Sequence, residues 1–457
     1  MQELSFDEVC KAIRGRPVSK GFPALPIKRI STDSRTLKSG DLFIALKGEK
    51  YDGHDFVREA VKKGASGVVV TRPVCPLPEG RAVIKVRDTL WALQELALYY
   101  RRKFSPLVIG ITGSNGKTTT KELIREVLSL RYKVLASPGN YNNLIGVPLT
   151  LFSLSSRVDV LVLEMATNHP GEIKRLAEIA APIKVGVFTN IGATHLEFFG
   201  SRENVLMAKM ELLTGIPREG IIILNNDDIY LRRCKNVIQY ECEVITYGLG
   251  RESRIKSTRP FLCSKGMRFR VETEKKSHVF FLRSIGGCNM YNALAAIALG
   301  NYMGISLGKM AGVMKRFRFP KMHLEISHKD GYTVINDSYN ANPDSVKEAI
   351  EALFNLSGRR KIVVFGDMLE LGENSRYLHQ EIGELIARKK TDFLFTYGEE
   401  ARWTAERASR KGMKGRVFAF QNKIDLINRL KEVLQRGDTL LIKGSRKTKM
   451  EEVIKKL

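Results

Sequence analysis

Residues 109–120 decide the fold of the central part of the chain, and they read Ile109-Gly110-Ile111-Thr112-Gly113-Ser114-Asn115-Gly116-Lys117-Thr118-Thr119-Thr120. An apolar segment at 106–111 predicts a strand that enters this glycine turn, and residues 121–131 predict a helix that leaves it. Glycines let the backbone fold closely around a phosphate and point successive N–H groups at it. The helix N-terminus adds about half a positive charge, and Lys117 adds a whole one. Thr118 supplies a hydroxyl where a phosphate-bound magnesium ion would sit. The stretch therefore predicts an ATP site.

The glycine turn matches a shortened form of the phosphate loop. The full pattern Gly-x4-Gly-Lys-[Ser/Thr] requires a glycine at position 111, where this chain has Ile111. The part that fits begins at Gly113 and ends at Thr118. Because strand, turn and helix follow in the required order, we predict that the nucleotide is bound by Gly113, Ser114, Asn115, Gly116, Lys117, Thr118 and Thr119.

The composition of the 457-residue chain is that of a globular protein with two or three domains. Its acidic N-terminus predicts no signal peptide, and no apolar run approaches the ~20 residues that span a bilayer. We therefore expect no transmembrane segment and a cytoplasmic protein. The cysteines are far apart, without zinc-binding spacing, and are expected to be reduced thiols: Cys10, Cys75, Cys234, Cys242, Cys263 and Cys288.

The formal net charge of +26 has two explanations. A nucleic acid or a membrane surface is one kind of partner for a basic protein, and a polyanionic small substrate is the other. The basic residues are spread over the whole chain, and clusters such as 359–361 and 388–390 are short. We favour the small anion and predict no nucleic-acid partner.

The pattern of apolar and helical segments predicts an α/β fold with three domains. Residues 1–83 alternate short strands and helices and predict a small α/β domain. Residues 84–317 carry apolar runs at 158–163, 185–189 and 220–224 between helical patterns, which predicts a mostly parallel sheet wrapped by helices. The strand-rich segment 237–285 predicts an antiparallel insertion in this second domain.

The third domain, residues 318–457, begins at a predicted hinge near residue 317. Its predicted strands lie at 333–336, 361–365, 393–397 and 439–442, each separated from the next by a helix. This alternation predicts a second doubly wound, Rossmann-like unit without a phosphate loop of its own.

Two polar side chains follow buried strands of the predicted central sheet. Glu164 ends the strand at 158–163, and His195 follows the strand at 185–189. The carboxyl ends of parallel strands form the crevice where such sheets bind ligands. Glu164 is thus either a magnesium ligand or a salt-bridging acid at a strand end. His195 is a metal ligand, a phosphate contact or a structural histidine.

Lys209 lies on the apolar stripe of a helix predicted over 202–213. One interpretation is a lysine that buries its stem and keeps its ammonium in water. The other is chemical, because burial penalises the charged ammonium and lowers the pKa of the amine. A neutral amine adds CO2 and becomes a carbamate, which is an anionic oxygen ligand. Both interpretations predict a semi-buried Lys209.

Two polar loops follow strands of the third domain. Residues 336–345 form a dense polar loop between a strand and a helix. The loop has more polar residues than are needed to cap the helix. Residues 443–446, Lys-Gly-Ser-Arg, form a basic loop with a glycine hinge after another strand. Such a loop suits a carboxylate or a phosphate.

Taken together, these residues resemble the Mur ligases, the ATP-dependent amide-forming enzymes of peptidoglycan precursor synthesis. The resemblance covers essentially the whole chain. The phosphate loop, residues 112–119, matches the family's shortened form. Glu164 and His195 match its magnesium ligands, and Ala208-Lys209 with Glu211 matches the segment that bears its carbamylated lysine. The adenine-side motif is matched by Asn289 and Asn292.

The resemblance also implies substrate-binding residues outside the central domain. The first domain is similar to the family's UDP-binding domain, with Ser34, Arg35, Phe43, Asp52 and His54. A loop of the second domain that contains Asn142 and Asn143 resembles the loop facing the muramoyl end of the substrate. In the third domain, Asp337 is implied on the nucleotide side, and the incoming substrate is implied to meet Tyr339, Asn340, Asn342, Lys443, Ser445 and Arg446.

Within the family, residues 337–343 and 366–373 resemble the members that join D-Ala-D-Ala to UDP-MurNAc-tripeptide. The resemblance implies that ATP phosphorylates the tripeptide carboxylate and that the dipeptide amine attacks the acyl phosphate. It implies ATP and Mg²⁺ as cofactors, a monomer, and a role in cell-wall formation, cell shape and cell division. Lys117, His195 and Lys209 would be catalytic. Thr118 and Glu164 would hold one ion, and His195 and Lys209 a second.

Three positions depart from the family pattern. Cys288 stands where many members have a histidine before the asparagine motif. Met322-His323 occupies the place of a Gly-Arg pair that meets the phosphates at the hinge, and Asn336 replaces a frequent aspartate.

Other functions remain as alternatives. They are a Mur ligase that adds a single amino acid, a folyl-polyglutamate-type ligase, a non-catalytic phosphate-loop protein and a nucleic-acid-binding protein. The complete first domain argues against the folyl type. The joint presence of Glu164, His195 and Lys209 argues for catalysis.

Overall fold

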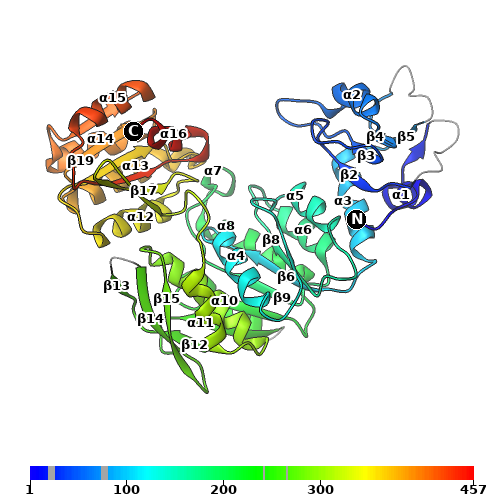
Figure 1. Ribbon diagram of the computed structural model, residues 1–457, viewed down its shortest axis with the longest axis horizontal. Helices are drawn as coiled ribbons and strands as arrows, with labels where there is room; N and C mark the ends of the chain where they lie inside the picture. The colour runs from blue at the N-terminus through cyan, green and yellow to red at the C-terminus, as the bar shows by residue number, and fades with distance from the viewer. Residues whose placement is uncertain (19–25, 74–80, 240–241, 264–265) are drawn as a thin grey trace.

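The computed structural model describes residues 1–18, 26–73, 81–239, 242–263 and 266–457. Three α/β domains follow one another along an arc, with the N-terminal domain (blue) at one end, the C-terminal domain (yellow to red) at the other, and the central domain between them (Figure 1). The predicted fold class is confirmed. In the described part of the chain, no helix has the length and apolar character needed to cross a membrane.

The N-terminal domain is built on a five-stranded sheet in the order β1-β5-β4-β3-β2, in which only the β1–β5 pair is antiparallel. Its first helix begins at a capping box between Ser5 and Glu8. The last strand, β5, continues to Lys85 and therefore spans the predicted boundary at residue 83. The elements are α1 (Phe6–Ile13), β1 (Arg16–Pro17), β2 (Arg29–Ser31), β3 (Asp41–Ile44), η1 (Gly53–Phe56), α2 (Val57–Lys62), β4 (Gly67–Val70) and β5 (Ala82–Lys85).

The central domain is built on a ten-stranded sheet in the order β13-β14-β12-β11-β10-β9-β6-β8-β7, with β15 paired to β14. Its elements are α3 (Thr89–Arg101), β6 (Leu107–Thr112), α4 (Lys117–Leu128), β7 (Val134–Ala136), α5 (Gly146–Leu151), β8 (Val160–Glu164), α6 (Glu172–Ala180), β9 (Val185–Phe188), α7 (Leu196–Phe199), α8 (Arg202–Met210), η2 (Glu211–Gly215), β10 (Ile221–Asn225), α9 (Ile229–Gln239), β11 (Glu243–Gly248), β12 (Ile255–Ser257), β13 (Phe261–Cys263), β14 (Gly266–Glu272), β15 (Ser277–Leu282), α10 (Cys288–Tyr302) and α11 (Leu307–Arg316).

The predicted antiparallel insertion at 237–285 is only partly correct. The strands β11 and β12 run parallel to their neighbours, and antiparallel pairing begins at β14. The reason is that α9 crosses over between β10 and β11, which brings the chain back in the parallel direction. The segment extends the central sheet instead of forming a separate unit.

The C-terminal domain is built on a six-stranded sheet in the order β16-β17-β21-β18-β19-β20. The four predicted strands are confirmed as β17, β18, β19 and β21, whereas the edge strands β16 and β20 were not predicted. The elements are β16 (Glu325–Lys329), β17 (Tyr332–Asp337), α12 (Pro343–Asn355), β18 (Lys361–Gly366), η3 (Gly372–Asn374), α13 (Ser375–Arg388), β19 (Phe393–Tyr397), α14 (Ala401–Ala408), η4 (Ser409–Met413), β20 (Val417–Phe420), α15 (Lys423–Val433), β21 (Thr439–Lys443), η5 (Arg446–Thr448) and α16 (Glu451–Lys456).

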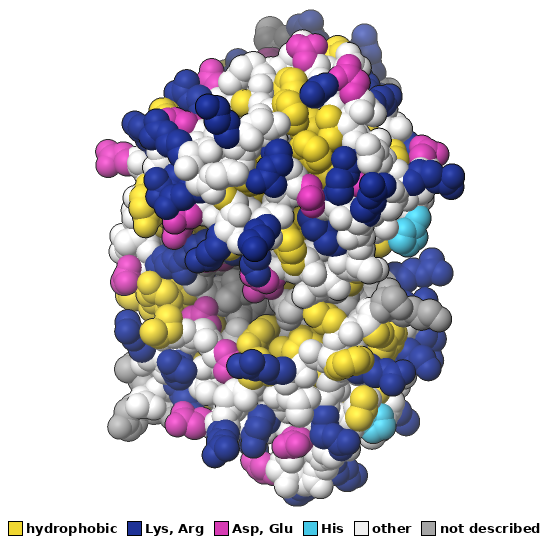
Figure 2. Space-filling view, turned by 90° about the vertical axis from the view of Figure 1, so that its left-hand side faces the viewer, with side chains coloured by type: hydrophobic (Ala, Val, Ile, Leu, Met, Phe, Trp, Pro, Cys, Tyr) yellow, Lys and Arg dark blue, Asp and Glu magenta, His cyan; other side chains and the backbone are white. Residues whose placement is uncertain are grey.

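The positive charge is distributed over the surface. Figure 2 shows Lys and Arg side chains scattered over one face of the molecule and interspersed with Asp and Glu. None of the five described cysteines forms a disulfide, and Cys75 lies outside the described residues.

Candidate active site

The phosphate-loop stretch connects β6 to α4. The helix begins at Lys117 and ends at Leu128, so it starts and ends earlier than the predicted range of 121–131. The difference arises because Gly116, in the left-handed conformation with φ +79°, is already the N-cap, and the threonines that follow form the first helical turn. The N–H groups of this turn therefore point toward the space in front of the loop, as phosphate binding requires.

Glycine is required at two positions of this loop. At Gly113, with φ +145°, an added Cβ would lie 1.9 Å from Thr189 Oγ1. At Gly116 an added Cβ would lie 2.2 Å from Asn292 Oδ1. Since both positions combine a positive φ with a close neighbour, any side chain would displace the loop.

The loop after β9 holds the phosphate loop in place. Thr189 Oγ1 and Asn190 Nδ2 both donate to the carbonyl of Asn115, at 2.7 and 3.0 Å. The N–H of Gly192 donates to Ser114 Oγ at 2.8 Å. The loop is therefore fixed by hydrogen bonds that do not depend on a nucleotide.

Lys117 lies folded against its own loop. Its ammonium donates to the carbonyls of Gly113 and Ser114, at 2.8 and 3.0 Å. Burial lowers the pKa of this amine, and the charge of Glu164 opposes that effect. The side chain lies where its charge would meet phosphates bound in front of the loop.

Glu164 is the last residue of β8 and is 1% exposed. Its Oε1 accepts from Thr118 Oγ1 at 3.0 Å and from Asn142 Nδ2 at 2.8 Å. Its Oε2 has no hydrogen-bond donor in the described part of the chain, and the Lys121 ammonium lies 3.5 Å away. A buried carboxylate oxygen without a donor, beside a threonine hydroxyl, fits a divalent cation that completes its ligands with phosphate oxygens and water.

The protein alone does not form a full metal cage at this position. Within the described ranges, no group of three His, Cys, Asp or Glu side chains is close enough to hold an ion. Magnesium typically binds to one or two carboxylates plus substrate phosphates, so a single glutamate at a phosphate loop fits this mode.

His195 lies beyond the end of β9 in the left-handed conformation, with φ +54°. Its neighbour Thr194 donates to Ser114 Oγ at 3.2 Å, so the histidine lies next to the phosphate loop. Its Nδ1 is 2.6 Å from Glu370 Oε2 of the C-terminal domain. The hydrogen bond with this histidine lowers the pKa of Glu370, which keeps the carboxylate ionised.

Lys209 is more deeply buried than the sequence predicted, with 1% exposure. The predicted helix over 202–213 ends at Met210 and continues as the short turn η2. Burial lowers the pKa of Lys209 well below its ordinary value, the charge of Lys117 lowers it further, and Glu172 and Glu211 oppose the shift. The Glu211 carboxylate is itself fixed by the N–H groups of Gly171 and Lys174, at 2.7 and 3.0 Å. Burial therefore favours the neutral form of the Lys209 amine, which lies within electrostatic reach of the phosphate loop.

Asn289 and Asn292 lie in the first two turns of α10 and are each 5% exposed. Asn292 accepts from Thr120 Oγ1 at 3.2 Å and donates to Asn289 Oδ1 at 3.0 Å, and Asn289 donates to Ser284 Oγ at 2.8 Å. This chain of hydrogen bonds ties α10 to the phosphate-loop helix. Contact with an adenine remains a prediction for both residues.

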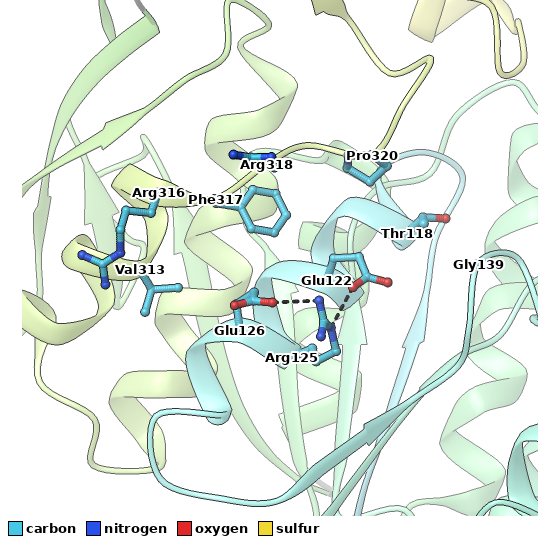
Figure 3. A pocket seen from close by; sticks show the side chains of 10 residues that line it. All are labelled: Thr118, Glu122, Arg125, Glu126, Gly139, Val313, Arg316, Phe317, Arg318 and Pro320. Carbon is cyan, nitrogen blue, oxygen red and sulfur yellow. Dashed lines mark hydrogen bonds and ion pairs between the residues drawn. The ribbon is translucent and has the colours of Figure 1, made fainter.

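A cavity of about 530 Å³ opens between α4 and the segment where the central domain ends (Figure 3). One wall is the outer face of α4, where Arg125 pairs with Glu122 and Glu126 at 2.8 and 2.7 Å. The opposite wall is residues 316–320, directly at the predicted hinge. Because Thr118 lies at its rim, the cavity adjoins the phosphate loop.

The polar loop after β17 meets the basic loop after β21. Lys443, 2% exposed, pairs with Asp337 at 2.5 Å and donates to the Asn340 carbonyl at 3.0 Å. The ring of His323 lies 4.6 Å from that of Tyr339. Burial lowers the pKa of His323, so it is neutral near pH 7 and does not replace the charge of the missing hinge arginine.

The other predicted residues of this domain have different partners. Asn342 caps α12 and forms a reciprocal amide pair with Asn115 of the phosphate loop, at 2.7 and 3.3 Å. Ser445 is buried and accepts from the N–H of Leu369 at 2.9 Å. Arg446 is exposed and pairs with Glu451 at 2.5 Å.

The predicted UDP-binding residues of the N-terminal domain divide into accessible and structural ones. The Arg35 side chain is 85% exposed and pairs with Asp33, whereas Ser34 is buried and donates to Glu59 at 3.3 Å. His54 uses both ring nitrogens, one with Asp52 at 2.6 Å and one with the N–H of Thr71 at 3.0 Å. These bonds tie the loop before α2 to the end of β4.

The substrate contact of Phe43 remains a prediction, and the side chain is buried in the structure. Phe43 is 1% exposed and lies in the core of the N-terminal domain, because all four residues of β3 are buried. Asn143, by contrast, lies at the N-terminus of α5, where its Oδ1 accepts from the N–H of Gly146 at 2.9 Å. Its neighbour Asn142 contacts Glu164, as described above.

Models of one protein family match three parts of the chain. The model "Mur ligase family, catalytic domain" matches residues 26–101, "Mur ligase middle domain" matches 111–300, and "Mur ligase, glutamate ligase domain" matches 322–446. A Bacillus subtilis (strain 168) protein named UDP-N-acetylmuramoyl-tripeptide–D-alanyl-D-alanine ligase is 39% identical over 459 residues, which cover 100% of this chain and 99% of that protein. The chain belongs to the Mur ligase family.

Solved structures resemble this Mur ligase over its whole length. A crystal structure of MurF from Acinetobacter baumannii has a TM-score of 0.91 and 32% identity, and covers 100% of this chain and 98% of that one. MurF ligase from Thermotoga maritima in complex with ADP has a TM-score of 0.84 and 28% identity, with coverage of 94% and 97%.

Several residues of this Mur ligase join the site without a sequence signal that predicts them. Asp344 of α12 accepts from the N–H of Ala193 and from Arg202, each at 2.8 Å, and so links the two larger domains. Lys121 is completely buried beside Glu164 and donates to the Gly139 carbonyl at 2.7 Å. An acid in the first turn of a helix predicts only a favourable helix end, so sequence reasoning missed the role of Asp344.

Proposed function

We propose that this protein is the ATP-dependent ligase that joins D-Ala-D-Ala to the terminal carboxylate of UDP-MurNAc-tripeptide in peptidoglycan precursor synthesis. The observation that carries the proposal is the full-length similarity to Mur ligases named for this reaction. The geometry of the central domain supplies a physical route. ATP phosphorylates the carboxylate, the dipeptide amine attacks the acyl phosphate, and ADP and phosphate leave.

The main physical difficulty of this reaction is the repulsion between a triphosphate and a carboxylate. Positive groups must offset the negative charge that gathers where the two meet. Lys117 and the N–H groups of the loop supply part of this charge. Mg²⁺, when bound, would supply the rest. We propose that Thr118 and Glu164 hold one ion and that His195 and Lys209 hold a second.

We propose that Lys209 acts as a carbamate. Its depressed pKa leaves a neutral amine whose nitrogen forms a bond to the carbon of CO2, and one proton passes to solvent. The product is an anionic oxygen ligand in a place where a plain ammonium would repel both a metal ion and Lys117. This explains why a lysine is buried here without a carboxylate at salt-bridge distance among the described residues.

The three domains divide the binding of the substrates. We propose that the N-terminal domain binds the uridine diphosphate, the central domain binds ATP, and the C-terminal domain binds D-Ala-D-Ala through the loops around Asn340 and Ser445. Asp337, bonded to Lys443, would lie on the nucleotide side. The protein would work as a monomer in the cytoplasm, where ATP is available.

The test is a ligation assay with purified protein, ATP, Mg²⁺ and each UDP-MurNAc-tripeptide, one with diaminopimelate and one with lysine as the third residue. ADP release that requires D-Ala-D-Ala supports the proposal. Release driven by single amino acids would favour another Mur ligase, and release driven by folate with glutamate would favour the folyl type. No release with any acceptor would favour a non-catalytic nucleotide-binding protein.

A further inference from the structure

The hydrogen bond between His195 and Glu370 crosses from the central to the C-terminal domain. His195 Nδ1 lies 2.6 Å from Glu370 Oε2, and the two residues are 175 positions apart in the sequence. The side chains are partly accessible, 23% and 36% exposed. A partly exposed pair of this kind contributes little to the docking of two domains. Its position beside the phosphate loop suggests another role.

The backbone around this pair is shaped to bring the two side chains together. The N–H of Glu197 donates to the Glu370 carbonyl at 3.1 Å. An added Cβ at Gly372 would lie 3.1 Å from Glu197 Cα, so the two loops are in close contact. Both His195 and Glu370 adopt the left-handed conformation, with φ +54° and +63°. Non-glycine residues hold such a conformation only where their surroundings require it.

The pair also fixes which nitrogen of His195 carries the proton. Glu370 Oε2 lies 2.6 Å from His195 Nδ1, and an ionised carboxylate oxygen can only accept a hydrogen bond. Nδ1 must therefore carry the proton, and in the neutral ring Nε2 has the free lone pair. Across the described chain, Nε2 has no hydrogen-bond partner. Metal-binding histidines characteristically show this arrangement, in which a carboxylate holds one nitrogen and the other is available to the metal.

We propose, on the basis of the function proposed above, that Glu370 is a positioning residue that orients His195 toward the second metal ion. The C-terminal domain thereby completes a metal site of the central domain when it docks. Docking is then coupled to the affinity of that site, so the ion is held best when the domain that carries the incoming amine is in place.

Other contacts join the C-terminal domain to the phosphate loop and to the segments on either side of His195. Asp344 accepts from the N–H of Ala193 and from Arg202, and Asn342 pairs with Asn115. These contacts fix the residues on both sides of the site, whereas Glu370 is the residue that hydrogen-bonds to the ring of His195 in the described part of the C-terminal domain. Docking and histidine orientation are therefore separable by mutation.

The experiment measures Mn²⁺ binding by electron paramagnetic resonance in the full-length protein with a non-hydrolysable ATP analogue. Glu370→Ala should raise the Kd of the weaker Mn²⁺ site by roughly 10–100-fold, the usual effect of removing a carboxylate behind a metal-binding histidine. Glu373→Ala is the matched control, because Glu373 is an exposed carboxylate on the same loop. It should bind Mn²⁺ as the wild type does.

A spectroscopic readout separates positioning from simple stability. ¹⁵N NMR of histidine-labelled protein should show His195 as the Nδ1–H tautomer in the wild type and as a mixture in Glu370→Ala. Glu370→Gln keeps an acceptor oxygen and should give a Kd between those of wild type and Glu370→Ala. If the alanine variant does not fold, the glutamine variant decides, and a Kd equal to that of the wild type overturns the proposal.

The outcomes distinguish this inference from the proposed function. A wild type that ligates D-Ala-D-Ala, together with a Glu370→Ala variant of unchanged Mn²⁺ affinity and unchanged tautomer, overturns the role of Glu370 alone. A wild type without ligase activity overturns the proposed function, whereas a shifted Mn²⁺ affinity would still support Glu370 as the residue that orients His195.

Discussion

Replacing Gly116 with alanine tests whether the phosphate loop has the shape that nucleotide binding needs. Two effects combine at this position. The φ of +79° is unfavourable for any residue with a Cβ, by about 1–2 kcal/mol. The new Cβ would also lie 2.2 Å from Asn292 Oδ1, which accepts the hydrogen bond of Thr120. Moving that amide leaves a buried hydroxyl without its acceptor, at a further cost of about 1–3 kcal/mol.

Both effects act within the phosphate loop. Without nucleotide the loop can relax away from the close contact, and binding restores the native loop shape, so the second cost sets the expected loss of affinity. A cost of about 1–3 kcal/mol corresponds to a roughly 5- to 150-fold weaker binding of ADP. Isothermal titration calorimetry with ADP and Mg²⁺ measures this change directly. Gly415→Ala is the matched control, because Gly415 has φ +81° and an added Cβ would meet nothing within 4 Å. Gly415→Ala should lower the free energy of unfolding by the cost of the positive φ alone, and it should bind ADP as tightly as the wild type.

A double variant tests whether the contact with Asn292 is the cause. If it is, Gly116→Ala combined with Asn292→Ala should bind ADP little more weakly than Asn292→Ala alone, because the oxygen that the new Cβ would meet is gone. A Gly116→Ala protein that binds ADP as tightly as Gly415→Ala would refute the reasoning.

Three further predictions follow from the site. Lys209→Ala should lose activity and regain part of it with added short carboxylates, and unchanged activity would make Lys209 structural. Burial lowers the pKa of Lys209 and so favours the neutral amine that reacts with CO2. Wild-type activity should therefore fall in CO2-depleted buffer and recover with bicarbonate, and indifference to bicarbonate would contradict a carbamate. Asp337→Ala leaves the buried Lys443 unpaired and should destabilise the C-terminal domain by about 3–5 kcal/mol in denaturant unfolding. Removal of the exposed Arg429–Glu432 pair, the matched control, should cost at most about 1 kcal/mol, and equal losses would contradict the burial argument.

The sequence predicted features that depend on neighbouring residues. The phosphate loop is one continuous segment, and the burial of Lys209 follows from helical spacing, so both could be inferred without coordinates. The edge strand β16 was missed because its residues Glu325–Lys329 are mostly polar and exposed. Helix α4 was placed too late because its first turn consists of threonines, which have weak helix propensity.

Contacts between distant segments could not be predicted. Glu370 and His195 are separated by 175 residues, and Asp344 and the N–H of Ala193 by 151. No local pattern indicates that these residues meet. Phe43 illustrates a second limit, because likeness to a motif does not tell which way a side chain points in a strand that is buried on both faces. The shape of the phosphate loop and the burial of Lys209 were thus predictable from the sequence, and the docking of the domains was not.

The most direct test of the account is the stoichiometry of the ligation reaction. Purified protein is incubated with ATP, Mg²⁺ and UDP-MurNAc-tripeptide, with and without D-Ala-D-Ala, and ADP and the nucleotide product are quantified by chromatography and mass spectrometry. The account predicts one ADP for each UDP-MurNAc-pentapeptide, and neither product when Lys117 is replaced by alanine. Formation of ADP without the pentapeptide, or of the pentapeptide by the Lys117→Ala protein, would contradict it.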